Sequence, residues 1–82
     1  MTTEEYNGIV TRFFEALAYL KESHQLRGVK TFCDRYGIHR RTLQRIQKEH
    51  STELRPSWLT GLVRDYGINA QWLLTGEGPM HA

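Results

Sequence analysis

The sequence predicts one all-α domain of five helices. Apolar residues recur at spacings of three and four along successive segments, which is the pattern of amphipathic helices. Glycine or proline stands where one such segment gives way to the next. The chain has 82 residues, of which 39% are hydrophobic and 24% charged, so it can hold one modest core and is globular rather than disordered. It has no repeat, low-complexity tract or interdomain linker.

The first helix is expected from about residue 3 or 4 to about residue 23. Thr2 or Thr3 can cap its start, and two glutamates in its first turn suit the helix dipole. Phe14 and Tyr19 fall at the edge of its apolar stripe, where they either border the core or contact a second subunit. His24 continues the stripe and is expected at the core or its rim. The remaining stripe residues are Tyr6, Ile9, Val10, Phe13, Leu17 and Leu20.

Residues 25–28 form a connection that ends in a glycine turn, and a short helix is expected over residues 29–36. Its apolar face carries Val29, Phe32, Cys33 and Tyr36 at helical spacing. Gly37 then ends the helix, because glycine adopts the left-handed conformation at little cost. The single cysteine cannot form an internal disulfide, and its position favours a small buried residue over a reactive thiol.

The next helix, about residues 40–48, has one apolar and one basic side. Leu43 and Ile46 point inward, whereas the outer side carries a set of polar residues that we call the basic ridge: Arg40, Arg41, Gln44, Arg45 and Lys48. The major groove of B-DNA admits a helix, and arginine and glutamine suit guanine and adenine edges. Residues 29–48 are therefore predicted to form a helix-turn-helix whose second helix reads DNA.

Two further helices complete the domain. After a polar loop over residues 49–55, Pro56 fits the first position of a core helix that ends at Gly67. Asn69 is a good N-cap for a short final helix over residues 70–75. Trp72, Leu73 and Leu74 are adjacent, so they cannot all face inward, and one of them is available to a partner.

Charge is concentrated in one sector. Residues 25–48 hold seven basic residues and one acidic residue, whereas the rest of the chain holds four basic and eight acidic residues, for a net charge of +2. A neutral-looking protein with one basic sector is suited to local phosphate binding. A solvated charged face is the alternative explanation.

The helix-turn-helix stretch resembles that of phage-repressor-like (lambda-repressor-like) transcription regulators. The likeness lies in Cys33, the Tyr-Gly-Ile run at 36–38, Leu43 and Ile46, and in the YGINAQWLLTGEG run over residues 66–78. Together the two motifs span most of residues 29–78. The resemblance implies a five-helix bundle, double-stranded DNA as the partner, and a homodimer joined through the final helix or the exposed edge of the first. The C-terminal oligomerisation domain of larger phage repressors has no counterpart here, so the chain is either a stand-alone regulator or the N-terminal piece of one.

The site residues follow from the ridge and the resemblance. Arg41 and Gln44 are the first choices for base contacts, and Arg40 and Arg45 come next. Contacts to the DNA backbone, which position a protein without specifying sequence, are expected from Lys30, Thr31, His39, Lys48 and Arg55.

Other function classes find little support. No histidine pairs with other ligand types at a metal-binding spacing, and no catalytic motif is visible, so no enzyme, cofactor, metal or small-molecule substrate is expected. No apolar run has membrane length and no signal peptide is present, which predicts a cytoplasmic protein without a membrane partner. The competing hypothesis is a protein-interaction module, an antitoxin or co-regulator, that uses the same helical fold.

Overall fold

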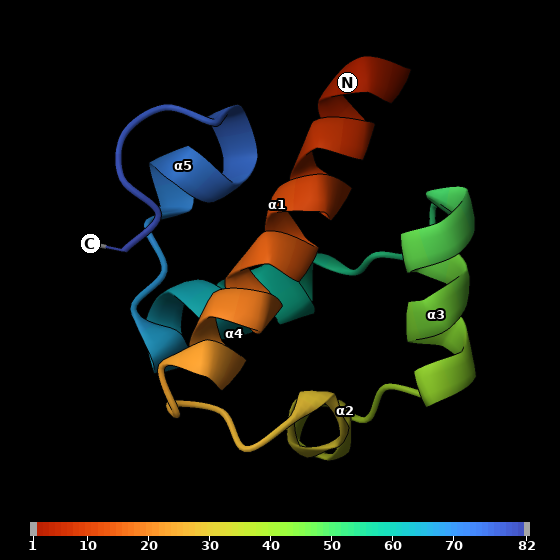
Figure 1. Cartoon of the computed structure of the whole chain (residues 1–82). Coiled ribbons are helices and arrows are strands. Elements are labelled where there is room, and N and C mark those ends of the chain that lie inside the picture. The colour runs from red at the N-terminus through yellow and green to blue at the C-terminus, as the bar shows by residue number, and fades with distance from the viewer. Residues whose placement is uncertain (1, 82) are drawn as a thin grey trace.

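A computed structural model describes residues 2–81 and confirms the all-α prediction (Figure 1). Within these residues lie five helices: α1 (Thr3–Glu22), α2 (Val29–Tyr36), α3 (Arg40–Glu49), α4 (Pro56–Tyr66) and α5 (Ala70–Thr75). Each boundary lies within one residue of its expected place; α3, for example, continues through Glu49, which was expected in the loop. No helix in this part of the chain is long and apolar enough to cross a membrane.

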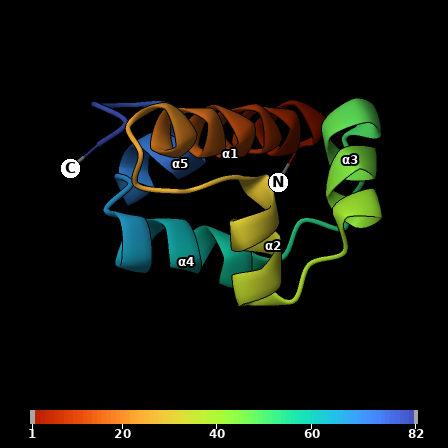
Figure 2. The same cartoon turned by 60° about the horizontal axis from the view of Figure 1, so that its bottom comes forward.

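Helix α1 is the element on which the others are assembled. It crosses the middle of the molecule in Figure 1 and runs along the upper edge, above α2 and α4, in Figure 2. In both views α3 lies towards one end of the molecule and α5 towards the other. Residues of α1 contact α3, α4 and α5. The Arg12 side chain fixes the last of these contacts, because its Nε donates to the Leu73 carbonyl at 2.8 Å and its Nη2 to the Leu74 carbonyl at 3.1 Å.

The start of α1 is capped as expected. The Thr2 hydroxyl accepts a hydrogen bond from the Glu5 backbone N–H at 3.1 Å, and Glu4 and Glu5 lie in the first turn. Tyr6, expected in the apolar stripe, is only half-buried. Its hydroxyl donates to the Ser51 carbonyl and thereby ties α1 to the α3–α4 loop.

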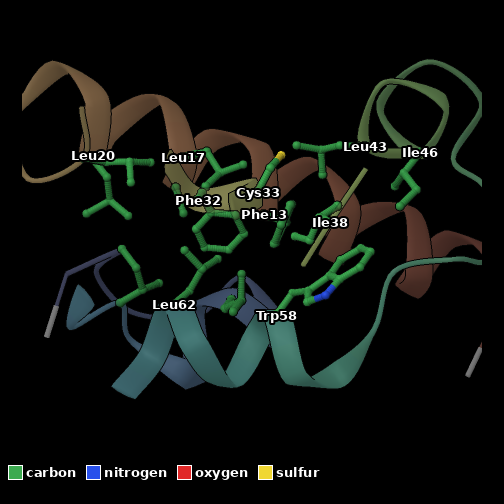
Figure 3. Close-up of a cluster of buried hydrophobic side chains, with 14 of the residues drawn as sticks. Phe13, Leu17, Leu20, Phe32, Cys33, Ile38, Leu43, Ile46, Trp58 and Leu62 are labelled. Carbon is green, nitrogen blue, oxygen red and sulfur yellow. The ribbon is translucent and has the colours of Figure 1, made fainter. Parts of the chain in front are cut away.

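The core lies between α1 and α4, and α2 and α3 close it from the side (Figure 3). Its centre is a pair of fully buried rings, Phe13 and Phe32, whose centroids are 5.8 Å apart in an edge-on arrangement. The remaining buried members come from all five helices and from three of the connections between them: Val10, Ala16, Leu17, Leu20, Leu26, Cys33, Ile38, Leu43, Ile46, Trp58, Leu62, Ile68 and Leu73.

The expected position of His24 is wrong. Helix α1 ends at Glu22, and His24 lies beyond it, exposed, with a positive φ of 62°. The chain turns there because the N–H groups of Gln25 and Leu26 both donate to the Leu20 carbonyl at 3.0 Å. Leu26, which lies in the connection after α1, is the residue of this turn that is buried in the core.

Helices α2 and α4 are joined at a close approach. Tyr36 donates from its hydroxyl to the Asp65 carboxylate at 2.5 Å, and its ring packs on Phe32 with centroids 4.7 Å apart. The ring fits because residue 61 is glycine. A Cβ there would lie 2.5–2.6 Å from Tyr36 ring and hydroxyl atoms. Partial burial and the Asp65 hydrogen bond raise the pKa of Tyr36 to about 12, and that bond lowers the pKa of Asp65.

A methyl group at residue 61 is therefore expected to destabilise the fold. Gly61→Ala forces the Tyr36 ring away from Asp65 and Phe32, and overpacking of this kind costs about 1–3 kcal/mol. Urea unfolding measures the loss. Gly28→Ala is the control, since a Cβ there meets nothing within 4 Å and replacing glycine by alanine at an N-cap should cost only about 0.5 kcal/mol. An equal loss in both variants would contradict the close approach.

The raised pKa of Tyr36 predicts a loss of stability at alkaline pH. The unfolded tyrosine ionises near pH 10 and the folded one at about 12, so the wild type loses free energy of unfolding as the pH rises between these values. Tyr36→Phe lacks this contribution. Urea midpoints should show the wild type's advantage over Tyr36→Phe in full below pH 10 and diminishing towards pH 12. A constant difference across that range would mean that the Tyr36 proton is not linked to folding.

Candidate nucleic-acid interface

Helix α3 is amphipathic in the way that the sequence predicts. Leu43 and Ile46 are 3% and 0% exposed and enter the core from its side (Figure 3). The five members of the basic ridge are all exposed. The residues at 43 and 46 are one helical turn apart, so they share one face, and the ridge residues occupy the rest of the surface. The hydrophobic contact thus determines which side chains α3 presents to solvent.

The turn between α2 and α3 sets the direction of α3. Gly37 adopts the left-handed conformation with φ of 66°, as its place in the sequence predicts. The Ile38 N–H then donates to the Cys33 carbonyl at 2.8 Å, and the Ile38 side chain is buried between the helices. Cys33 is buried as expected, and its burial raises the pKa of the thiol. The turn is therefore held by a backbone hydrogen bond and by the buried side chain of Ile38.

Most of the ridge is free to bind a partner. Among residues 2–81, no salt bridge or side-chain hydrogen bond engages Arg40, Arg41, Gln44 or Lys48. Arg41 and Arg45 are one turn apart, and like charges at this spacing repel one another. An unpaired cluster of cations and an amide on a rigid helix is the geometry that attracts an anionic ligand with hydrogen-bond acceptors.

Arg45 differs from the rest of the ridge. Its Nε donates to Glu53 Oε2 at 3.1 Å and its Nη2 to Glu53 Oε1 at 3.0 Å. Sequence reasoning missed this pair, although both charges were visible, because it depends on how the loop over residues 50–55 folds back on α3. Lys30 is also paired, with Asp34 at 3.1 Å across one turn of α2, but both of these side chains are largely exposed, and such pairs contribute little.

The expected backbone-contacting residues lie on three parts of the surface, one of which is the last turn of α3 with Lys48. His39 and Arg55 occupy the N-cap positions of α3 and α4, and neither side chain caps its helix. Both line one hollow of about 610 Å³, together with Thr42. Lys30 and Thr31 are exposed in the first turn of α2. The structure therefore brings His39 and Arg55 together beside the start of α3.

Arg40 lies at the flank of the ridge, as expected. With Gln44 it lines a groove of about 300 Å³ between α3 and α1, whose other walls include Phe14 and Lys21. Phe14 and Tyr19 are half-buried at the edge of the core. Arg41 and Lys48 do not line this groove, which leaves them on the outermost side of α3.

The described residues offer little for metal chemistry. No group of three or more histidine, cysteine, aspartate or glutamate residues between 2 and 81 could hold a metal ion.

Comparison of the chain with protein-family models, curated proteins and solved structures gives no significant match.

Truncating the buried Ile46 side chain of α3 is expected to lower the free energy of unfolding more than truncating an exposed side chain of the same helix. Ile46→Ala leaves a cavity under the helix and should lower the free energy of unfolding by about 2–5 kcal/mol. Gln47→Ala, an exposed neighbour, should change it by less than about 0.5 kcal/mol. Chemical denaturation followed by circular dichroism separates the two. Equal effects would show that α3 is not held through Ile46.

Proposed function

We propose that the protein binds double-stranded DNA sequence-specifically as a small transcription regulator, with residues 40–48 of α3 in the major groove. The observation that carries the proposal is the unpartnered outer face of α3. Arg41 lies near the centre of this face and Gln44 lies between Arg41 and the groove beside α1, on a helix anchored by buried residues. Arginine can donate two hydrogen bonds to guanine, and glutamine can donate to and accept from adenine.

The order of elements supports a helix-turn-helix of the lambda-repressor-like kind. Helices α2 and α3 and the turn through Gly37 and Ile38 form the reading unit of the proposal, and α1, α4 and α5 form its support. Phosphate contacts from His39 and Arg55 beside the start of α3, and from Lys48 at its end, would position the helix. Lys30 and Thr31 at the start of α2 add to this set.

We further propose that the protein acts as a homodimer on paired half-sites, because one small domain makes few base contacts. Leu74 supports α5 as the seam: it is 48% exposed and is the one large hydrophobic residue with such exposure in the part of the chain that the structure describes. The α5 flank lies opposite α3 (Figure 1), so pairing there leaves both ridges accessible.

The central test compares two ridge variants on selected DNA. A duplex is first obtained by selection from a random pool. Arg41→Ala should lose about 1–3 kcal/mol on this duplex and blur the preference at one base position. Lys48→Ala should weaken binding to all sequences alike and reduce the dependence on salt. Fluorescence anisotropy at several salt concentrations measures both effects.

Arg64→Ala is the matched control, because Arg64 is an exposed arginine on α4, away from α3. It should leave affinity nearly unchanged. If Arg41→Ala binds as well as Arg64→Ala, then α3 is not the reading helix. If the wild-type protein shows no salt-dependent affinity for any DNA, the fold serves instead as a protein-interaction module. Sedimentation of the complex should give two chains per duplex.

A further inference from the structure

The pair formed by Arg45 and Glu53 has a specific geometry. The two hydrogen bonds, at 3.1 and 3.0 Å, run from Nε and Nη2 to the two oxygens of one carboxylate. Glu53 thus occupies one complete edge of the guanidinium group, in the fork arrangement that gives such pairs their directionality. Both side chains remain accessible, at 45% and 42% exposure, and within residues 2–81 the other edge of Arg45 forms no hydrogen bond.

The open edge still has the donors that a base requires. Arginine carries five N–H donors, and the fork uses one at Nε and one at Nη2. The two at Nη1 and the second at Nη2 remain, and one of the Nη1 donors forms the end of the guanidinium plane together with the free Nη2 donor. Paired donors on one edge of this plane match O6 and N7 of guanine in the major groove. Because the carboxylate occupies the Nε–Nη2 edge, Arg45 can form paired hydrogen bonds with a base only through the Nη1–Nη2 edge of its guanidinium group.

The loop that carries Glu53 is itself held in place. The Glu53 N–H donates to the Ser51 hydroxyl at 3.3 Å, and the Ser51 carbonyl accepts from the Tyr6 hydroxyl of α1. The same Tyr6 hydroxyl accepts from the Leu54 N–H at 3.4 Å. Glu53 thus stands on a segment fastened to the central helix. A fixed carboxylate restricts the rotamers of a long side chain before any ligand arrives, which lowers the ordering cost on binding.

A carboxylate beside the ridge is unfavourable for simple phosphate binding. It cancels one positive charge and repels the DNA backbone, so it lowers affinity for every sequence. A gain in selectivity would compensate for this loss. We propose that Glu53 is a positioning residue that aims Arg45 at a guanine, and that the preferred duplex has a G·C pair opposite Arg45. This inference rests on the proposed DNA-binding function and names one base pair of its ligand.

The test uses three kinds of DNA: the selected duplex, a set of copies that each have one G·C pair replaced by an A·T pair, and unrelated DNA. The wild-type protein should prefer guanine at one position by about tenfold. Glu53→Gln should lose most of this preference and bind unrelated DNA several times more tightly. Glu49→Gln is the control: it removes an acid at the exposed end of α3 that forms no ion pair within residues 2–81. It should tighten binding to unrelated DNA but retain the preference for guanine.

Arg45 variants show whether the effect passes through this residue. Arg45→Ala should abolish the preference at that position, and adding Glu53→Gln to it should change the preference no further. The inference is overturned if Glu53→Gln keeps the wild-type preference, if Arg45→Ala keeps it, or if Glu49→Gln loses it as Glu53→Gln does. Failure of the wild-type protein to bind any duplex would instead refute the proposed function.

Discussion

The burial of Leu43 and Ile46 beneath α1 is the contact on which the surface of α3 depends. A helix of ten residues is too short to be stable alone in water, and the arginines on its outer side repel one another. Its structure is therefore imposed by packing against the core, chiefly against the bundle that α1 organises. Because the packed face is narrow and apolar, the remaining surface carries the cations and amides, and their direction is fixed with the backbone.

Electrostatics refine this arrangement without creating it. The ion pairs within residues 2–81 lie between exposed or partly exposed groups, so they contribute little to stability. Polar side-chain contacts act on orientation instead: the ion pair with Glu53 sets the plane of the Arg45 guanidinium, and a hydrogen bond to Asp65 holds Tyr36 against α4. Elsewhere on the ridge Arg41 and Lys48 are left unpaired, which is a cost that an anionic partner would relieve.

The sequence predicted the helices well because their signals are local. The spacing of Leu43 and Ile46, the cap at Asn69 and the left-handed glycine at residue 37 each depend on a few neighbouring residues, and the structure bears out all three. The errors arose where distant segments meet. The exposed position of His24, the Tyr36–Asp65 contact beside Gly61 and the Arg45–Glu53 pair depend on loop paths and helix docking. Periodicity carries no information about these. The sequence predicted the members of the basic ridge, but the pairing of Arg45 with Glu53 depends on the path of the loop over residues 50–55, which the sequence does not reveal.

The most direct measurement of the central claim is a map of amide chemical-shift changes as the selected duplex is added to the labelled protein at moderate salt. Contact through α3 predicts that the largest changes fall on residues 40–48, with smaller changes near His39 and Arg55 and almost none in the exposed face of α4. Large changes confined to α4 or α5, with α3 unaffected, would contradict it.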